Sequence, residues 1–152
     1  MKNLNFYLSK VSDTDLNLTF NLANEKVARK WSLNPSKIKY LGHFRWLKKK
    51  LKKKDFYFWK LMKKSKCFGL VRIEKIKKKY ELSYLISQKF RGKSLGSKMI
   101  NLATKRILRI KPKTKIFAKS FVKNISSNKT LLKSNFIFVK KNKNINLYVY
   151  KK

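Results

Sequence analysis

The sequence predicts a single mixed α/β domain with the element order β-α-α-β-β-β-α-β-α-β-β. Three observations support this fold class. The chain has 152 residues, close to the usual size of one domain. Hydrophobic residues make up 43% of it, which is enough for a packed core. Segments in which apolar and polar residues alternate, as in strands, lie between segments of helical periodicity. We therefore expect one domain spanning residues 1–152.

Residues 1–54 are expected to form one strand and two helices. The strand is predicted by apolar residues that alternate with polar ones, at Leu4, Phe6 and Leu8. A helix follows over 13–23, because Ser12 precedes Asp15 by three residues, a weak form of the capping box. Residues 24–35 lack periodicity and predict a loop or a broken helical turn. The second helix spans 39–54, and its buried stripe is expected to hold Phe44, Leu47 and Leu51.

From residue 55 onward, aromatic and β-branched segments predict strands. Three of them, separated by short turns rich in Lys and Ser, form an antiparallel meander over 55–62, 66–76 and 80–86. A turn containing two glycines then leads into a helix that ends at Pro112. The chain closes with a strand over 115–121, a short helix over 126–134, and a hairpin formed by 136–140 and 145–150.

Positive charge dominates the composition, with 42 Lys and Arg against 6 Asp and Glu and a formal net charge of +36. Such an excess is typical of proteins that bind nucleic acid through counterion release. Only six of the basic residues are Arg, however, whereas specific recognition of phosphates and bases favours the planar Arg fork. Two interpretations of the lysines stay open: a solvated surface, which we favour, and an anion-binding face over 36–79. We expect no specific binding of nucleic acid.

Several classes of function are excluded by what the sequence lacks. A single cysteine, Cys67, allows no internal disulfide. One histidine and few carboxylates argue against a protein-built metal site, so no metal is expected. No apolar run approaches the roughly 18 residues of a membrane-spanning helix. The N-terminus also lacks the apolar core of a signal peptide. The expected location is the cytoplasm, without membrane insertion.

The most informative segment is a strand, turn and helix around Arg91, Gly92, Lys93, Ser94, Leu95, Gly96 and Ser97. Unpaired N–H groups and the helix dipole favour an anion at a helix start, and small residues let phosphates approach the backbone. The spacing is not that of a Walker loop, and a dinucleotide fingerprint needs more glycines. The residues alone leave two interpretations open: a pyrophosphate site or an ordinary turn containing glycine.

This segment resembles the acetyl-CoA motif of the GNAT superfamily of N-acetyltransferases, which is Gln or Arg, two residues, Gly, one residue, then Gly or Ala. Arg91, Ser94 and Gly96 occupy these positions, with Ser94 replacing the first glycine. A second motif, from Asn124 to Phe136, resembles the family's Asn, two residues, Ala or Ser, short helix and Gly-Phe. Asn135 takes the Gly position, where it suits a left-handed helix end. The resemblance covers essentially the whole chain and implies the GNAT fold, with a twisted and mostly antiparallel central sheet.

The resemblance also implies that acetyl-CoA is the acyl donor, and it assigns residues to the cofactor. Backbone groups of Tyr84, Leu85 and Ile86 would pair with the pantetheine arm like an added strand. The amides from Arg91 to Ser97 would hold the pyrophosphate. Asn124 and Ser127 would contact the cofactor near its pantetheine or thioester end.

Catalysis in this family is direct attack of a neutral amine on the thioester, helped by proximity and by a general base. Glu81 matches the position where relatives often carry a base that works through water, with Glu74 as the weaker candidate. The alternative for Glu81 is a strand-edge carboxylate paired with a lysine. Many relatives place a Tyr general acid four residues before the Gly position, where this chain has Leu131. The possible substitutes are Tyr84, Ser126 and Ser127.

Residues 24–32 resemble the acceptor segment of a GNAT subgroup that acetylates UDP-linked amino sugars, as in the pseudaminic-acid pathway for surface glycans. The shared pattern is Asn followed after three or four residues by Arg; His43 with Trp46, and Gly69 with Arg72, extend the likeness. The implied acceptor site contains Asn24, Arg29, His43 and Trp46. Arg29 suits a phosphate or carboxylate, and Trp46 suits stacking. Other interpretations stay open: core packing for Trp46, a helix-start cap for His43 and a strand-surface cation for Arg72.

The favoured partner is thus a small amine acceptor, a nucleotide sugar, bound by a monomer or homodimer. Two alternatives remain. One is acetylation of a protein N-terminus or lysine, as by ribosomal-protein acetyltransferases. The other is a degenerate GNAT domain that binds CoA or an anionic partner without turnover, an interpretation motivated by Ser94, Leu131 and the extreme charge.

Overall fold

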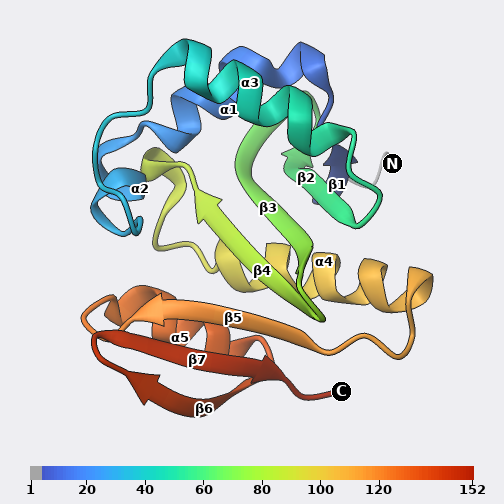
Figure 1. Cartoon of the computed structure of the whole chain (residues 1–152), viewed down its shortest axis with the longest axis vertical. Helices are drawn as coiled ribbons and strands as arrows, with labels where there is room; N and C mark the ends of the chain where they lie inside the picture. Colours follow the sequence, from blue (N-terminus) through green and yellow to red (C-terminus); the bar gives the residue numbers. More distant parts are fainter. Residues whose placement is uncertain (1–4) are drawn as a thin grey trace.

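The computed structural model describes residues 5–152. A seven-stranded sheet in the order β1-β2-β3-β4-β5-β7-β6 forms its centre, and helices cover both faces (Figure 1). The strands are β1 (Tyr7–Lys10), β2 (Phe56–Lys63), β3 (Lys66–Ile76), β4 (Lys79–Ile86), β5 (Ile116–Phe121), β6 (Phe136–Asn142) and β7 (Ile145–Tyr150). The α-helices are α1 (Leu16–Ala23), α2 (Lys26–Lys30), α3 (Tyr40–Leu51), α4 (Leu95–Ile110) and α5 (Ile125–Lys133). Short 3₁₀ turns span η1 (Asp13–Asp15) and η2 (Gln88–Phe90).

The sheet opens at its one parallel strand pair, β4 with β5. These strands pair only from Tyr80 with Ile116 to Leu82 with Ala118. Beyond Leu82, β4 continues along β3 as far as Ile86, while β5 turns away along β7. Figure 1 shows the two strands diverging towards the ends that their arrows mark. The edge of β4 from Ser83 to Ile86 that faces β5 therefore has no strand partner.

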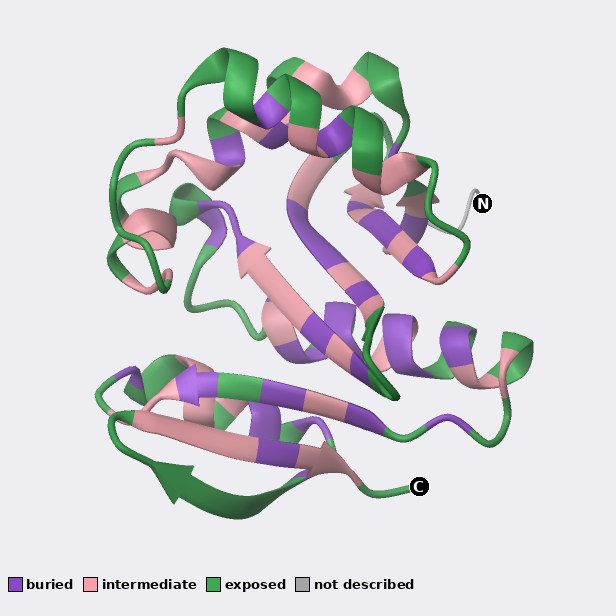
Figure 2. Cartoon of the chain, viewed as in Figure 1, coloured by how far each residue is buried: buried purple, intermediate pink, exposed green. Residues whose placement is uncertain are grey.

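Alternation along the strands gives the sheet two apolar faces. On one face, side chains such as Val71, Ile73 and Leu82 pack against α4, whose buried and exposed residues alternate in Figure 2. On the other face, Phe56, Phe58 and Leu70 pack against Leu22 of α1 and Leu47 of α3. Residues that stand opposite each other on antiparallel strands share a face, so each side of the sheet collects a defined set of side chains.

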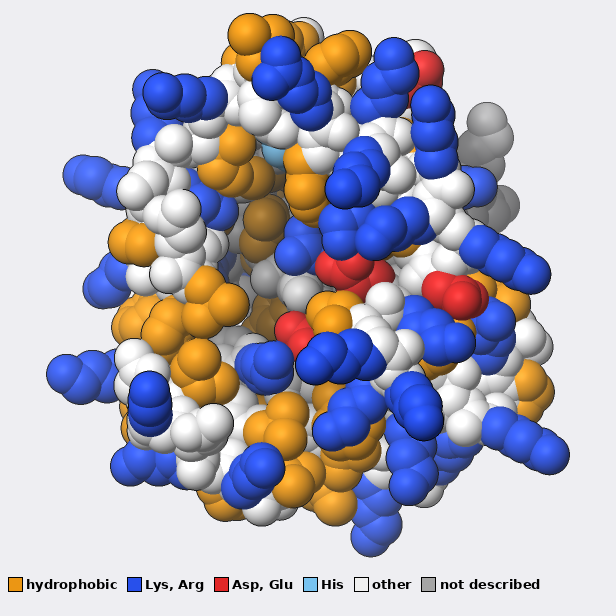
Figure 3. All heavy atoms as spheres, viewed as in Figure 1, with side chains coloured by type: hydrophobic (Ala, Val, Ile, Leu, Met, Phe, Trp, Pro, Cys, Tyr) orange, Lys and Arg blue, Asp and Glu red, His pale blue; other side chains and the backbone are white. Residues whose placement is uncertain are grey.

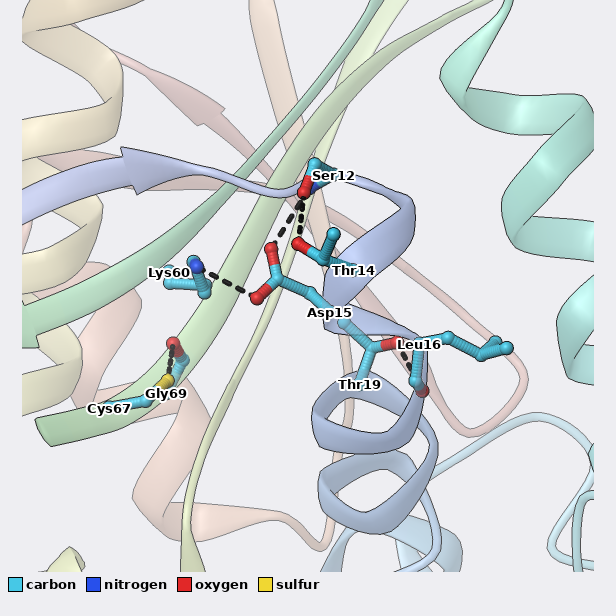
Figure 4. Close-up of polar contacts among 8 residues, drawn as sticks. All are labelled: Ser12, Thr14, Asp15, Leu16, Thr19, Lys60, Cys67 and Gly69. Atoms are coloured by element: carbon cyan, nitrogen blue, oxygen red, sulfur yellow. Dashed lines mark hydrogen bonds and ion pairs between the residues drawn. The ribbon is translucent and has the colours of Figure 1, made fainter.

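The start of α1 is tied to the sheet by the carboxylate of Asp15. Ser12 N–H donates to its Oδ2 at 2.9 Å, and Lys60 Nζ of β2 contacts its Oδ1 at 2.8 Å (Figure 4). The pairing of Ser12 with Asp15 that the sequence indicated is thus present, although it closes a 3₁₀ turn and α1 begins only at Leu16. Cys67 lies nearby and donates its thiol to Gly69 O at 3.5 Å (Figure 4).

The predicted fold class is confirmed: the chain is a mixed α/β domain with a mostly antiparallel sheet. The segment 24–35, expected to be a loop or a broken helical turn, contains the five-residue helix α2. The buried stripe of α3 differs at its first position, where His43 is buried and Phe44 is 40% exposed, while Leu47 and Leu51 pack inward as expected. Leu4, expected in the first strand, lies outside the described residues.

Asn135 confirms the expectation for the end of α5. Its φ of 64° is left-handed, as the Gly position of the motif requires. None of the described helices has the length and apolar character needed to cross a bilayer.

Candidate active site

A cavity of about 650 Å³ opens where β4 and β5 part. The helices α1–α3 and the loop after α2 form one side, β3, β4 and β5 form the floor, and α5 closes the far end. Figure 3 shows the molecule hollowed in this region, with hydrophobic side chains inside and Lys and Arg around the rim. Most of the residues that the sequence singled out line it, namely Arg29, His43, Trp46, Glu81, Tyr84, Leu85, Ile86, Arg91, Asn124 and Ser127. Asn24 and the loop 92–97 do not line it.

The unpaired edge of β4 is open to an extended ligand. An extended ligand can add to an open strand edge through backbone hydrogen bonds, as an extra strand would. Residues 83–86 supply such an edge on one side of the cavity, and β5 has moved away far enough to leave room. The predicted cofactor residues Tyr84, Leu85 and Ile86 therefore lie where an added strand would run.

The start of α4 has the features of a pyrophosphate site. Gly92 and Ser94 both adopt left-handed conformations, with φ of 79° and 56°. At Ser94, the family's glycine would hold this conformation without strain, whereas serine does so at some cost. The first amides of α4 have no intrahelical acceptors and lie at the positive end of a 16-residue helix. Lys133 of α5 reaches the same turn, with its Nζ 3.3 Å from Ser94 Oγ.

Gly96 lets α4 begin close to its neighbours. A Cβ atom at this position would lie 3.0 Å from Cγ2 of Thr130 and 3.4 Å from Cε2 of Tyr84. The second glycine of the motif therefore sets how closely the start of α4 approaches α5 and β4, which frame the cofactor edge.

Asn124 and Ser127 lie together at the start of α5. The Asn124 side chain caps this helix, since its Oδ1 accepts a hydrogen bond from Ser127 N–H at 3.2 Å. Tyr84 O–H donates to Ser127 Oγ at 3.1 Å. Burial raises the pKa of Tyr84, so its hydroxyl keeps its proton at neutral pH. The cofactor end of the cavity thus holds a carboxamide and two hydroxyls.

The position of the usual Tyr general acid is apolar. Leu131 lines the cavity and is only 1% exposed, so no proton donor stands there. Among the possible substitutes, Tyr84 and Ser127 line the cavity, whereas Ser126 is exposed outside it.

Glu81 is the one carboxylate among the described residues that lines the cavity. It lies one residue before the last pair of β4 with β5, and Lys119 Nζ of β5 is 3.4 Å from its Oε2. Glu74 stands opposite Glu81 on β3 but does not line the cavity. Its Oε2 is 2.5 Å from Lys50 Nζ. Of the two candidate bases, Glu81 has the position from which an amine in the cavity can be reached.

The helices α1–α3 and the loop after α2 form the wall of the cavity that is called the acceptor side below. Arg29 and Asn24 hold this loop in place. The guanidinium of Arg29 donates to the carbonyls of Ala23, Asn34 and Ser36 and to Ser32 Oγ, at 2.7–3.3 Å. Burial lowers the pKa of Arg29. The Asn24 side chain binds both backbone groups of Ile38, at 2.8 and 3.0 Å. These bonds explain why the segment 24–38 keeps a defined shape despite its lack of periodicity.

His43 and Trp46 project from α3 into the same side of the cavity. Thr19 Oγ1 donates to Leu16 O and lies 2.8 Å from His43 Nε2. Because the hydroxyl has a single proton, Nε2 must donate in this arrangement. Burial lowers the pKa of His43, which favours the neutral ring. The rings of His43 and Trp46 stack with centroids 5.4 Å apart.

The sequence indicated Arg72 only as a minor feature, but it lines the cavity beside Trp46. Two lysines were not singled out from the sequence: Lys119, which also lines the cavity, and Lys133, which contacts Ser94. Neither lysine differs in sequence from the many others. Arg72 could have been found from the sequence, because only six of the 42 basic residues of this chain are arginines. Within residues 5–152, no group of three or more His, Cys, Asp or Glu side chains is placed to hold a metal ion.

A family model described as an acetyltransferase (GNAT) domain matches residues 5–137. The chain belongs to the GNAT family. This confirms the expected family, and with it an N-acetyltransferase that uses acetyl-CoA. A search of curated protein sequences finds no significant match for this GNAT domain.

Solved structures share the fold of this GNAT domain over nearly its whole length. A domain from Methanocaldococcus jannaschii superposes with a TM-score of 0.82 at 22% identity, covering 97% of this chain and 98% of that one. Spermidine N-acetyltransferase from Vibrio cholerae, in complex with CoA and spermine, gives 0.82 at 16% identity, with 97% and 94% covered. RimL, a ribosomal-protein α-N-acetyltransferase in complex with coenzyme A, gives 0.81 at 12% identity, with 97% and 94% covered.

Proposed function

We propose that this GNAT domain transfers the acetyl group of acetyl-CoA to the amino group of a UDP-linked amino sugar. The observation that carries the proposal is the lining of the cavity on the acceptor side. Arg72 and Lys119 supply positive charge there, and Trp31, Trp46 and Phe121 supply aromatic surface. A nucleoside diphosphate joined to a sugar presents the matching groups, since it has phosphates for cations and a planar base for aromatic rings.

The residues that resemble the nucleotide-sugar subgroup contribute to this lining in two ways. His43 and Trp46 line the cavity directly, where Trp46 offers a stacking surface. Asn24 and Arg29 act through the loop that they fasten, and we assign them to positioning. Because acetyl-CoA and UDP-sugars are cytoplasmic metabolites, the proposal places the reaction in the cytoplasm.

Chemistry in the proposed site is a single transfer, in which the C–N bond forms as the C–S bond breaks. Glu81 accepts the proton of the attacking amine through a water molecule, and Lys119 Nζ lies 3.4 Å from this carboxylate. The departing thiolate takes the hydroxyl proton of Tyr84, which is directed to Ser127 Oγ in the free site and must turn from it. Much of the rate comes from holding amine and thioester together at the point where β4 and β5 part.

The proposed function is tested by measuring CoA release from acetyl-CoA with a panel of amines. The panel contains a UDP-4-amino sugar, the same amino sugar without its nucleotide, spermidine, and a peptide with a free N-terminus. We expect the UDP-4-amino sugar to give the highest kcat/KM. Release with the peptide alone would contradict the sugar assignment. Tight CoA binding without release for any amine would favour a binding module.

The assignment of the base is tested with Glu81→Gln and its neighbour across the sheet, Glu74→Gln. General-base catalysis contributes roughly 100- to 10,000-fold. Glu81→Gln is therefore expected to lower kcat at least about 100-fold while the Kd for CoA stays within about twofold. Glu74→Gln is the matched control. An equal loss of kcat in both variants would show that the loss comes from removing a negative charge from β3 or β4, and the assignment of Glu81 as the base would be wrong.

A further inference from the structure

The side chain of Arg72 lies at the point where β4 and β5 part. Arg72 stands opposite Ser83, the first residue of β4 beyond its pairing with β5. Its guanidinium carbon lies 5.3 Å from the centroid of the Trp46 ring, so the ring supports the guanidinium plane from α3. The side chain retains 35% of its accessible surface, and the residue lines the cavity.

The hydrogen-bonding capacity of this guanidinium is not met within the described residues. Arg72 Nε is the one buried side-chain nitrogen or oxygen in residues 5–152 that has no hydrogen-bond partner. Its nearest carboxylate oxygen, Glu74 Oε1, is 3.7 Å away, which is too far for a hydrogen bond. Native proteins pair almost all such groups, so this N–H marks Arg72 as a side chain whose polar partners are incomplete within residues 5–152.

Glu74 forms an ion pair with Arg72 at 3.7 Å, but neither Glu74 nor Glu81 accepts a hydrogen bond from it, and lysines also engage both acids. Glu74 Oε2 is in contact with Lys50 Nζ, and Glu81 Oε2 is in contact with Lys119 Nζ. Burial lowers the pKa of Arg72, while the charges of Glu74 and Glu81 act in the opposite direction. The guanidinium stays charged in this setting. A partly buried cation with free donors and a supporting ring is preorganised for a planar or tetrahedral oxyanion, which it can bind through two hydrogen bonds.

We propose that Arg72, supported by Trp46, binds an oxyanion on the acceptor itself, so that the substrates of this enzyme are amines that carry a phosphate or carboxylate group. The inference rests on the proposed function and deepens it. Arg72 and Glu81 are diagonal neighbours on paired strands, a position at which residues lie about 7–8 Å apart and their Cβ atoms somewhat closer. One small molecule can therefore place its anion on Arg72 and its amine within reach of Glu81.

Charge selection follows from this arrangement. A polyamine such as spermidine would bring several positive charges to a wall that carries Arg72, Lys119 and Arg91 against one carboxylate. Like charges in a partly desolvated site repel each other by far more than they would in water. The same wall attracts an anionic amine. The acceptor is thus distinguished by its charge, and an amino sugar without an anionic group is expected to bind weakly.

The proposal is tested with Arg72→Gln and Arg72→Lys, and Lys75→Gln serves as the matched control. Lys75 lies on the same strand, is exposed and does not line the cavity, so its substitution changes the net charge equally. We expect Arg72→Gln to raise the KM for the UDP-amino sugar at least tenfold. The KM for the same amino sugar without its nucleotide and the Kd for CoA should each change by less than about twofold. Arg72→Lys should recover only part of the loss, because lysine lacks the planar fork.

Binding of UDP to the CoA-saturated protein, measured by calorimetry, gives a readout that does not require turnover. The wild type and Lys75→Gln should bind UDP, and Arg72→Gln should lose at least tenfold in affinity; uridine, which has no phosphate, should be insensitive to the substitution. If the UDP-amino sugar is acetylated and Arg72→Gln behaves like Lys75→Gln, the inference is wrong and the proposed function stands. If only an amine with a carboxylate, such as an amino acid, is acetylated with the same sensitivity to Arg72, the inference stands and the nucleotide-sugar assignment is wrong.

Discussion

The proposed cofactor side, made by β4 and the start of α5 in the cavity wall and by the start of α4 beside it, presents mainly backbone groups, whereas the proposed acceptor side presents side chains. Strand edge 83–86 and the first amides of α4 need no particular side chain. The acceptor side depends on His43 and Trp46 from α3 and on Arg72 from β3. A backbone site tolerates substitutions such as Ser94 for glycine, but a side-chain site changes its ligand when one residue changes.

The two sides also differ in where their rigidity comes from. On the cofactor side, strands and helices pack closely, with glycines at the points of nearest approach. On the acceptor side, side-chain hydrogen bonds from Arg29 and Asn24 fasten an irregular segment. Substitutions should therefore harm the first side by steric overlap and the second by loss of hydrogen bonds.

The largest expected effect is the difference in stability between alanine substitutions at two glycines, Gly69 beside β4 and Gly42 on α3. A Cβ at Gly69 would lie 2.5 Å from the carbonyl oxygen of Leu85, so Gly69→Ala must push β3 and β4 apart. Overpacking of this kind costs about 1–3 kcal/mol, and we expect the upper end because the contact is with backbone. Gly42 lies in α3, where nothing stands within 4 Å of the added Cβ. Gly42→Ala should instead stabilise the fold by about 0.5–1 kcal/mol, from helix propensity. Urea denaturation measures both, and a stable Gly69→Ala protein would contradict the steric account.

The next largest effect is expected from removing side-chain hydrogen bonds that hold the segment 24–38. Arg29→Ala removes donors to four oxygen atoms, and hydrogen bonds to a charged group contribute roughly 1.5–3 kcal/mol. We expect a loss of about 2 kcal/mol in unfolding free energy and a raised KM for the acceptor, with the Kd for CoA unchanged. Lys26→Ala, an exposed substitution on the same helix, is the control. Equal weakening of CoA binding by Arg29→Ala would show that the two sides are not independent.

A smaller effect is expected on the cofactor side. Lys133 is exposed but reaches Ser94 Oγ, next to the proposed pyrophosphate position. Lys133→Met should weaken CoA binding about threefold to tenfold, and added salt should reduce the difference, as for exposed ion pairs. Lys129→Met removes the same charge from the same helix, without a contact to the α4 turn, and should leave the Kd within twofold. If both lysines contribute equally, the attraction is a general property of the basic surface.

Local patterns in the sequence predicted the elements that form the proposed cofactor side, because each element is a short run of consecutive residues. The meander over β2–β4, the turn before α4 and the left-handed Asn135 each follow from a few neighbouring positions. The acceptor side depends on contacts between distant segments. His43 takes the buried position expected for Phe44 because Thr19, 24 residues away, offers it a hydrogen bond. The short helix α2 includes Arg29, whose partners lie as far along the chain as Ser36, and no short periodicity can show this.

The smallest expected effect concerns His43, which is the only histidine of the chain and lies on the acceptor side. Burial lowers the pKa of His43 below its usual 6.5, so the folded protein favours the neutral ring. The unfolded chain takes up a proton as the pH falls through 6.5, and the folded state resists this uptake. The contribution of the neutral ring to stability is therefore complete above pH 6.5 and is lost progressively below it. We expect the unfolding free energy to decline between pH 7.5 and pH 5.5, where carboxylates do not yet titrate appreciably. His43→Gln can still donate to Thr19 and should flatten this decline. A slope that persists in the variant would place the titrating group outside α3 and would remove this distinction between the two sides.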